Sequence, residues 1–520
     1  MEDSDTLTLR PPQTELQAIC QSIAAGSDIR RIIADVAPGG GKSKLPVILA
    51  SMLIPAFADR LLWIVPRNSL KEQGEAEFVD PRLPTDRRLR AANGNESDPT
   101  RGTDGYITTY QAVGMSPAQH LQFVQRHRTI LFLDEPHHAG EDSSWGDALD
   151  PMIDAAVLVV HASGTFSRHD GQKIHGLDYH GAFVDLRNRP GVRVIRYSRG
   201  QALRDGSILP VDLVTIDGAA EWVSKEGIRR RVDSLHRSGV DRSDALFSML
   251  RTEYAFQLLA ACLEHWAEHR KEYPAAKLLV VAPDIETAKE YQGRLAAKVL
   301  SEIATSDDGP GARRAIADFK RGVFDALVTV GMAYEGMSVP ETTHIACLTQ
   351  IRSKEWLEQM QARANRVAPG KRQGWVFAPK DHAFLDAWAA IEREALTPLF
   401  EPDEQGGGTA GPVGEAEDFG LSSPGIEPLW SSAHGIVADL DEVRTPTLTA
   451  SQSERVLLEN IRAIHASIVK NARPGSGKAL ATIYSRTCRS VRDVALEELT
   501  TDELTEVWIR LRGVFSKRLD

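Results

Sequence analysis

The chain has 520 residues, 42% of them hydrophobic and 26% charged, which is ordinary for a folded protein and excludes a mainly disordered chain. At about 150 residues per domain, this length predicts roughly three or four domains. No apolar run approaches the ~20 residues that cross a bilayer, and the acidic start lacks the apolar segment of a secretory signal. The four cysteines are scattered without a CxxC pair, so we expect no disulfide framework, no zinc ribbon and a cytoplasmic location without membrane contact.

The net charge of −11 is concentrated in one segment. Ten acids and no Lys or Arg lie between Glu401 and Glu442, so this segment carries −10 and the rest of the chain carries −1. A basic groove on the nearly neutral remainder is compatible with this distribution, and nucleic acid is not excluded as a partner.

Short apolar runs alternate with helical stretches between residues 30 and 390. The runs are residues 31–36, 61–65, 129–133, 157–160, 277–281, 325–330, 344–348 and 375–377. Continuous apolar runs separated by helices are typical of parallel strands that are buried on both faces. The pattern therefore predicts two α/β domains.

Changes in composition suggest where these domains begin and end. We expect the first domain over residues 1–210 and the second over 211–400, with a polar, Arg-rich helical insertion near 221–274. Residues 401–444 are rich in acids, Gly and Pro, which predicts a flexible linker. Residues 444–520 carry a net charge of +4 and have apolar residues at helical spacing, which predicts a small helical domain over residues 445–520.

The segment IIADVAPGGGKS at residues 32–43 predicts a phosphate-binding loop (P-loop), with a Gly-rich turn that binds nothing as the alternative. An apolar strand leads into three glycines, which let backbone N–H groups close round phosphate oxygens, and a helix is expected over residues 45–53. Lys42 would reach the β- and γ-phosphates of ATP, and the Ser43 hydroxyl would bind Mg²⁺. The expected nucleotide contacts are Pro38, Gly39, Gly40, Gly41, Lys42 and Ser43. A second Gly-Lys segment at residues 474–478 follows no strand and is expected to cap a helix.

Asp134 and Glu135 end the apolar run at residues 129–133, where a doubly wound sheet presents its ligands. Asp134 would hold Mg²⁺, and Glu135 would polarise the attacking water. A solvated acidic strand end is the alternative, which the upstream phosphate loop disfavours.

Farther along the chain, Gln359, Arg363 and Arg366 have the spacing of one helix face. Arginines placed there can reach across a cleft to the γ-phosphate and stabilise the charge of the transition state.

In this order, the segments resemble the motifs of superfamily 2 helicase-type ATPases, of the DEAH-like branch that includes the motor parts of type III restriction enzymes. The resemblance covers roughly residues 9–370 and rests on LRPPQ at 9–13, APGGGKS at 37–43, VPRNSLKEQ at 65–73, ITTYQ at 107–111, the DEAD/DEAH-box-like DEPHH at 134–138, SGTFSR at 163–168, VVAP at 280–283, TVGMAYEGMSVP at 329–340 and QMQARANR at 359–366. It implies two tandem RecA-like doubly wound parallel-sheet domains with ATP in the cleft between them, and Gln13 as the residue that reads adenine.

The resemblance also implies a motor cycle in which ATP closes the two domains and hydrolysis reopens them. Candidate contacts to the nucleic-acid backbone are Arg67, Ser69, Thr108, Thr109 and Thr329. For the hydroxyl residues among them, a helix cap or turn is nearly as good an interpretation.

These observations predict a nucleic-acid-dependent ATPase of helicase or translocase type, and the resemblance favours DNA over RNA. One alternative is an ATP-gated module that binds nucleic acid or a partner protein without processive unwinding. Another is the motor subunit of a defence or restriction complex whose nuclease is a separate protein. In the tail after residue 400 no Lys follows an acid at the two-residue spacing that many nucleases use.

Overall fold

The computed structural model of the chain describes residues 8–140, 143–164, 166, 173–180, 183–330, 337–396, 426–434, 477–490, 492, 495–498, 503 and 507. The chain divides into two compact units, Met1–Val443 and Arg444–Asp520. Among the described residues, no helix is long and apolar enough to cross a membrane.

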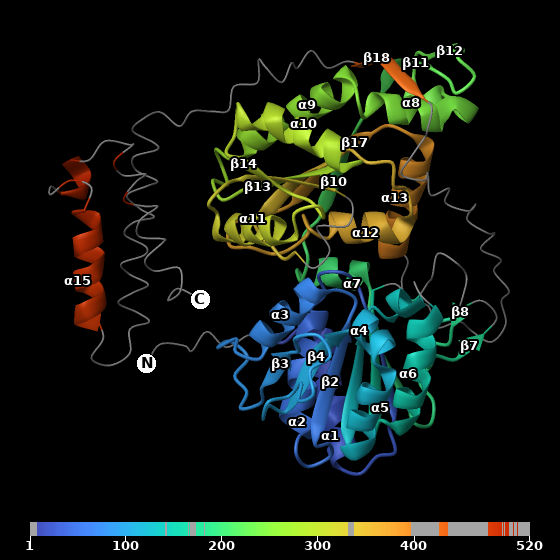
Figure 1. Cartoon of the computed structure of the whole chain (residues 1–520), viewed down its shortest axis with the longest axis vertical. Coiled ribbons are helices and arrows are strands. Elements are labelled where there is room, and N and C mark those ends of the chain that lie inside the picture. The colour runs from blue at the N-terminus through green and yellow to red at the C-terminus, as the bar shows by residue number, and fades with distance from the viewer. Residues whose placement is uncertain are drawn as a thin grey trace. The chain divides into compact units, whose positions relative to one another are not determined.

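The first half of the larger unit is built on a seven-stranded sheet in which all paired strands are parallel (Figure 1). Its strand order is β3 (Leu89–Ala91), β4 (Gly105–Thr109), β2 (Arg60–Val65), β5 (Thr129–Asp134), β6 (Leu158–Ser163), β1 (Arg31–Val36) and β9 (Val192–Tyr197). The helices of this half are α1 (Pro11–Ala24), α2 (Leu45–Leu53), α3 (Asn68–Glu77), α4 (Tyr110–Met115), α5 (Pro117–Arg126), α6 (Ser143–Ala155) and α7 (Arg199–Arg204).

Strand β2 explains why these apolar runs fold as buried strands. Successive side chains of a strand point to opposite faces. Leu61 and Trp63 pack into the layer that contains α1 and α2, whereas Leu62 and Ile64 pack into the layer that contains α4, α5 and α6. Because both faces are covered, both sets of positions must be apolar, and the strand reads as a continuous hydrophobic run.

The second half has a six-stranded sheet, also parallel throughout. Its strand order is β10 (Val211–Ile216), β17 (Gly374–Pro379), β16 (Thr342–Cys347), β13 (Lys277–Ala282), β15 (Ala326–Val330) and β14 (Ser301–Ala304). The helices are α9 (Glu253–His269), α10 (Ile285–Ala296), α11 (Gly309–Arg321), α12 (Lys354–Gln361) and α13 (His382–Leu396). The predicted fold class, α/β with two parallel sheets, is confirmed.

A third, antiparallel sheet lies in the region that was expected to be a helical insertion. Strand β11 (Gly218–Val223) pairs with β12 (Arg229–Val232) on one side and with β18 (Glu427–Ala433) on the other, and α8 (Arg242–Met249) packs against it. The region is therefore part strand and part helix. A turn closed by the Ser224 N–H bond to the Ile228 carbonyl (2.8 Å) connects β11 to β12.

Strand β18 corrects the linker prediction. It belongs to the segment 401–444, which composition alone marks as flexible, yet Ser431 is fully buried and Ala433 packs in the core beside α9. The pairing partner of β18 is about 200 residues away in sequence, at Gly218–Val223, so no local pattern indicates it. The remaining residues of the predicted linker lie outside the described ranges, apart from Ile426 and His434.

The smaller unit is described in part. It contains α15 (Gly477–Cys488) and a short 3-10 turn at Leu496–Glu498. Helix α15 begins inside the second Gly-Lys segment. The amphipathic helix expected near residues 451–470 lies outside the described residues.

Candidate functional site

The phosphate loop joins β1 to α2, as the sequence predicts. Gly39 and Gly41 have φ angles of +86° and +100°, a region of the backbone map that favours glycine. A Cβ atom on Gly40 would lie 2.8 Å from the Ala37 carbonyl oxygen, so this position has no room for a side chain. The chain then enters a 3-10 turn at Lys42–Lys44 and the helix α2.

Helix α1 holds this loop from one side. The buried Gln13 donates through Nε2 to the Gly41 carbonyl at 3.0 Å and accepts from the Arg10 N–H at 2.9 Å. The Arg10 guanidinium donates to the Gly39 carbonyl. The predicted adenine reader therefore also fixes the phosphate loop, together with an arginine that the prediction did not include.

The carboxyl end of β5 presents the acidic pair. Glu135 has a φ of +47°, which is rare for a residue with a side chain, and its N–H bonds to the Ala162 carbonyl at 2.8 Å. Its carboxylate forms an ion pair with the Lys42 ammonium and accepts a hydrogen bond from the Ser163 hydroxyl. Strand order explains the contact, because β5 is separated from β1 by β6 alone, and β6 supplies Ser163.

The two carboxylates differ in their protonation behaviour. Burial and the nearby charge of Glu135 raise the pKa of Asp134 well above its usual range, and Lys42 opposes this only in part. Burial also disfavours the charged form of Glu135, but Lys42, His137 and the hydrogen bonds from Lys42 and Ser163 outweigh it and lower the pKa of Glu135. Glu135 is thus held as a carboxylate, whereas Asp134 needs a further positive charge to stay ionised at neutral pH.

The arginines come from the second half, and here the predicted helix is too long. Helix α12 ends at Gln361, and the turn bonds of Arg363 N–H to the Met360 carbonyl (3.0 Å) and of Ala364 N–H to the Gln361 carbonyl (2.9 Å) follow it. Of the three predicted residues only Gln359 is helical, and Arg363 and Arg366 lie in the irregular segment after the helix.

The environment of Arg366 suits an anion. Its Nε atom is buried without a hydrogen-bond partner among the described residues. Burial, followed by the nearby charges of Arg363 and Arg10, lowers the pKa of Arg366 to about 9. Such a guanidinium gains most from a negative ligand that relieves both effects.

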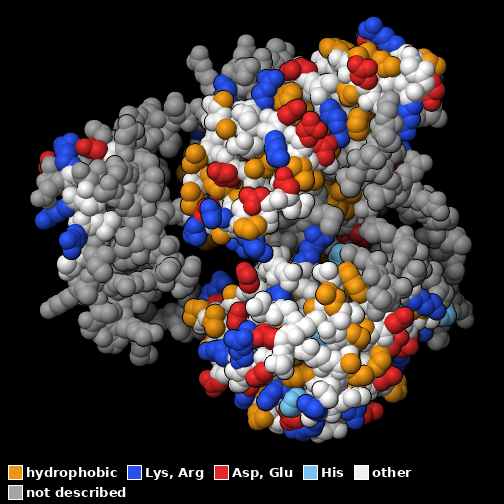
Figure 2. All heavy atoms as spheres, in the orientation of Figure 1, with side chains coloured by type: hydrophobic (Ala, Val, Ile, Leu, Met, Phe, Trp, Pro, Cys, Tyr) orange, Lys and Arg blue, Asp and Glu red, His pale blue; other side chains and the backbone are white. Residues whose placement is uncertain are grey.

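Both sets of residues line one cleft of about 410 Å³. From the first half come Gln13, Pro38, Gly39, Gly41, Lys42, Ser43, Asp134 and Glu135, and from the second half come Gln359, Arg363 and Arg366. Figure 2 shows Lys and Arg side chains along the hollow between the two halves. The phosphate loop and the arginines therefore line the same cleft, as expected. Gly40 is not among the lining residues.

The oxygen groups in this cleft fit Mg²⁺. A serine hydroxyl and a carboxylate are ligands that Mg²⁺ accepts, and the ion usually takes its remaining ligands from phosphates and water. Ser43 and Asp134 both line the cleft, and the raised pKa of Asp134 indicates a deficit of positive charge there. In the described ranges, no three His, Cys, Asp or Glu side chains form a metal cage of their own.

Comparison with known proteins agrees with this arrangement. Residues 6–168 match the family described as type III restriction enzyme, res subunit. A solved structure of the ATP-dependent type ISP restriction-modification enzyme LlaBIII bound to DNA is similar in fold, with a TM-score of 0.50 and 13% identity over 98% of this chain and 38% of that chain. The comparisons therefore show similarity to the type III restriction enzyme family over residues 6–168 and a fold shared with LlaBIII.

Two curated relatives are similar to this chain over most of its length. The uncharacterized protein Rv2917 of Mycobacterium tuberculosis is 25% identical over 405 residues, 76% of this chain and 66% of the relative. The uncharacterized protein ML1624 of Mycobacterium leprae is 25% identical over 429 residues, 80% of this chain and 70% of the relative. The chain thus spans slightly less than two thirds of the length of the first relative.

The nucleic-acid candidates lie near strand ends of the two parallel sheets, outside the cleft lining. Arg67 and Ser69 begin α3, directly after β2, and Ser69 is exposed. Thr108 and Thr329 are 1% exposed, and the Thr109 hydroxyl caps α4 by accepting from the Ala112 N–H at 3.2 Å. Thr109 therefore acts as a helix cap, which was the alternative interpretation. Among the hydroxyl candidates, Ser69 is the one that is exposed to solvent.

Asn365 is a cleft-side residue that the prediction missed. Its side chain is 1% exposed, its Oδ1 atom has no hydrogen-bond partner in the described part of the chain, and a Cβ atom on Gly39 would lie 3.0 Å from it. It therefore packs against the phosphate loop from the other half. In the sequence Asn365 lies between Arg363 and Arg366, and only this position indicated that it could lie near the cleft.

Residues 331–336, within the segment TVGMAYEGMSVP at 329–340, and residues 165, 167 and 168, within the segment SGTFSR at 163–168, lie outside the described residues. Of the flanking residues, Ser163 contacts Glu135 and Ser338 lines the cleft.

Proposed function

We propose that the protein is a nucleic-acid-dependent ATPase of helicase or translocase type that acts on DNA. The observation that supports this most directly is the single cleft in which Lys42 and Glu135 of one half face Arg363 and Arg366 of the other. A triphosphate in such a cleft contacts both halves, so binding and hydrolysis can change how they pack. The match to the type III restriction family favours DNA.

Nucleotide binding would rearrange charges that are already paired. Lys42 now neutralises Glu135, and the phosphates of ATP would draw the Lys42 ammonium towards themselves. Glu135 would then be free to orient and deprotonate the attacking water. Ser163, which donates to Glu135, would keep the carboxylate aimed while Lys42 is engaged elsewhere.

The remaining groups would stabilise charge. Ser43 and Asp134 would hold Mg²⁺, which when bound neutralises phosphate oxygens. Arg363 and Arg366 would contact the γ-phosphate, and their loss of that contact after hydrolysis would weaken the link between the halves. A strand gripped near Ser69 and near the carboxyl end of β15 would then be moved by each cycle, with little dependence on base sequence.

ATP hydrolysis measured with and without single-stranded DNA, duplex DNA and RNA tests the proposal. We expect DNA to stimulate the unaltered protein, Lys42→Ala to lose ATP binding, and Glu135→Gln to bind ATP while turning over at least about 100-fold more slowly. Glu286→Gln, on the exposed side of α10, is the matched control.

Two outcomes would count against the proposal. Hydrolysis that no nucleic acid stimulates would contradict a motor, and ATP binding without strand displacement or translocation would instead favour a nucleotide-gated binding module. Full turnover by Glu135→Gln would remove this carboxylate from the mechanism.

A further inference from the structure

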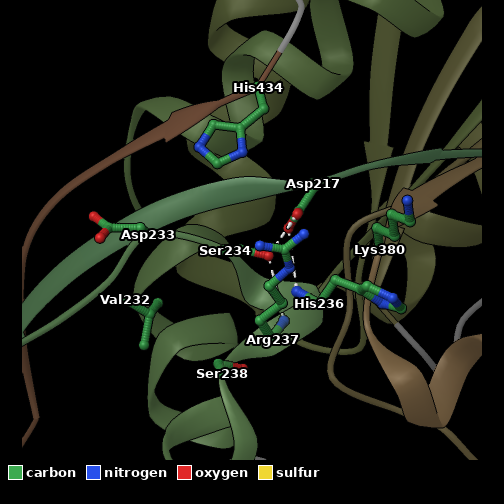
Figure 3. Close-up of a pocket in the computed structure, with 9 residues that line it drawn as sticks. All are labelled: Asp217, Val232, Asp233, Ser234, His236, Arg237, Ser238, Lys380 and His434. Carbon is green, nitrogen blue, oxygen red and sulfur yellow. Dashed lines mark hydrogen bonds between the residues drawn. The ribbon is translucent and has the colours of Figure 1, made fainter.

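A second pocket, of about 500 Å³, lies where the three-stranded sheet joins the six-stranded one (Figure 3). It is lined by Asp217, Val232, Asp233, Ser234, His236, Arg237, Ser238, Lys380 and His434. None of these residues belongs to the nucleotide cleft. The sequence indicated no site here, because the lining comes from four separate segments.

The Asp217 carboxylate in this pocket already has hydrogen-bond donors within the protein. The Asp217 carboxylate accepts hydrogen bonds from the Gly218 N–H (2.8 Å), the Ser234 hydroxyl (2.6 Å) and the His236 N–H (3.1 Å). Burial disfavours its charged form, but these bonds outweigh burial, and together with the charge of His434 they lower the pKa of Asp217. Asp217 therefore shapes the pocket wall and has little capacity left for a cation.

The donor groups, in contrast, are unused. In the described part of the chain the side chains of Arg237, Lys380 and His434 make no hydrogen bond and no ion pair, and Nδ1 of His236 is buried without a partner. The His236 ring stacks on that of His382, with centroids 4.2 Å apart, which fixes its orientation. Figure 3 shows the Arg237 guanidinium and the His434 ring on either side of the space near Asp217. Several unpaired donors around one cavity indicate an anionic ligand.

The position of the pocket indicates the source of that anion. Asp217 directly follows β10 and Lys380 directly follows β17, so both lie at the carboxyl edge of the parallel sheet. Thr329, a nucleic-acid candidate whose own side chain is buried, marks the carboxyl end of β15 on the same edge. Two strands, β16 and β13, separate β17 from β15, which corresponds to roughly 15 Å at about 4.8 Å per strand. A nucleic-acid strand that follows this edge covers that distance in two or three nucleotides.

The neighbouring sheet offers further contacts to such a strand. Arg231, Glu221 and Trp430 are aligned across β12, β11 and β18, and the Arg231 guanidinium lies 5.8 Å from the Trp430 ring centroid. Trp430 is 43% exposed, so its ring is accessible for base stacking. Arg229 and Arg231 are paired with Glu221 and Asp233 respectively, whereas Arg230 has no ion pair among the described residues. Figure 2 shows Lys and Arg side chains beside hydrophobic ones at this end of the protein.

We propose that the pocket around Arg237 and Lys380 binds a phosphate group of a nucleic-acid strand that leaves the motor core along the carboxyl edge of the second sheet. The inference rests on the proposed nucleic-acid binding of the core. It adds an anchor that lies outside the nucleotide cleft and that engages the strand in the absence of ATP.

Nucleotide-free binding of a labelled 20-nucleotide single strand to the full chain, measured by fluorescence anisotropy over a range of salt concentrations, tests the proposal. We expect the Arg237→Ala/Lys380→Ala variant to bind about ten-fold more weakly and its salt slope to fall by about 1, the change expected for the loss of one phosphate contact. The control Lys289→Ala/Arg321→Ala removes the same charge from exposed positions on α10 and α11, and it should bind as the unaltered chain does. Thermal unfolding of each variant verifies that the fold is intact.

Three results would overturn the inference. Equal affinity and salt slope in the pocket variant and the control would show that the pocket takes no part in binding the strand. Calorimetric binding of inorganic phosphate or pyrophosphate that depends on Arg237 and Lys380, with unchanged strand binding, would assign the pocket to a free phosphate compound. Failure of the unaltered chain to bind any strand would remove the proposed function as well, which distinguishes that case from the other two.

Discussion

Glu135 combines an unusual backbone conformation with a charge held by its neighbours. A φ of +47° costs a residue with a side chain about 1 kcal/mol or more, so the surrounding contacts must hold it. Those contacts are the bond to Ala162, the ion pair with Lys42 and the bond from Ser163. Lys42 and Ser163 are also part of the proposed chemistry, which is consistent with strain that persists at a functional position.

Lys371 gives a prediction for the pH dependence of stability. Its ammonium is buried and donates to the carbonyls of Pro340 (2.8 Å) and Thr342 (2.6 Å), and burial together with Arg366 lowers its pKa to about 7. Between pH 7 and the ordinary value near 10.5, the unfolded chain binds a proton at this site that the folded chain does not. This group therefore makes the free energy of unfolding increase with pH in that window, by up to about 1.4 kcal/mol per pH unit.

Urea unfolding of Lys371→Met and of the unaltered chain at several pH values between 7 and 10 measures this slope. The difference between the two chains isolates Lys371, because the other titrating groups are common to both. We expect the slope to be smaller in the variant, and parallel pH profiles would show that Lys371 keeps an ordinary pKa.

Two glycines provide a matched test of the phosphate loop. A Cβ atom on Gly40 would lie 2.7 Å from Val36 Cγ1 and 2.8 Å from the Ala37 carbonyl oxygen, whereas Gly293 in α10 has no atom within 4 Å of the added carbon. We expect Gly40→Ala to lower ATP affinity at least about ten-fold by displacing the loop. Gly293→Ala should leave affinity unchanged and stabilise α10 by about 0.5–1 kcal/mol. Equilibrium titration with a fluorescent ATP analogue and thermal unfolding of both variants provide the comparison.

At the scale of single residues, the sequence predicted those site residues whose positions depend on their neighbours along the chain. Lys42 follows a strand and three glycines, and Glu135 ends an apolar strand, so their positions follow from neighbours in sequence. Asn365 and Arg10 reach the same loop from segments far away along the chain, and no periodicity indicates such contacts. Whether the residues at the ends of β4 and β15 are buried likewise depends on tertiary packing. The sequence therefore suggested Thr108 and Thr329 as accessible contacts, although both side chains are buried.

Among the secondary-structure elements, eight strands of the two parallel sheets were predicted from the sequence, whereas β3, β4, β9, β10, β14 and the strands of the three-stranded sheet were not. The eight apolar runs correspond to β1, β2, β5, β6, β13, β15, β16 and β17, because strands covered on both faces must be apolar throughout. Strands β11, β12 and β18 contain polar residues such as Glu221, Arg230 and Ser431, so they do not read as continuous apolar runs, and the pairing of β11 with β18 spans about 200 residues. The predicted helix that carries Gln359, Arg363 and Arg366 was too long. The residue spacing typical of a helix continues past Gln361, but α12 ends there and the backbone turns.

The link between α2 and α3 leads to a prediction at this scale. The Lys44 ammonium, next to Ser43, is paired with Glu77 (2.5 Å), the last residue of α3, and with Asp80, and all three side chains are at most 16% exposed. Removing Lys44 takes this partner from the shielded Glu77 carboxylate and leaves Asp80 with Arg82, which costs up to about 3 kcal/mol for a buried pair. We therefore expect Lys44→Met to lower the free energy of unfolding by about that amount at neutral pH.

The pair of Lys289 and Asp307 is the control for Lys44. Its side chains are 61% and 44% exposed, so Lys289→Met should leave stability almost unchanged. Urea denaturation of both variants makes the comparison, and the double variant Lys44→Met/Asp80→Asn should regain part of the loss. Equal stability of the two single variants would mean that solvent already screens the Lys44 pairs.

At the scale of the whole molecule, further contacts join the two halves of the larger unit in addition to the shared lining of the nucleotide cleft. Arg199 of α7 pairs with Glu392 of α13 at 3.1 Å, and the Leu209 N–H bonds to the Asn365 carbonyl at 2.6 Å. Leu209 lies in the short connection between the two sheets, directly before β10. The segment that carries Arg363 and Arg366 is thus attached to the connection, so movement of one involves the other.

The place of β18 yields a prediction about where the chain can be shortened. The buried Ser431 hydroxyl accepts from the Tyr254 N–H at 2.9 Å, and the Ala433 N–H donates to the Gln257 side chain at 2.6 Å, so β18 satisfies polar groups at the start of α9. A chain ending after residue 443 keeps these bonds, whereas one ending after residue 425 leaves the Tyr254 N–H and one edge of β11 unpaired. We expect the longer fragment to keep the thermal unfolding midpoint of the larger unit and the shorter one to unfold at least about 5 °C lower. Differential scanning calorimetry distinguishes the two cases, and identical midpoints would place residues 426–434 outside the cooperative fold.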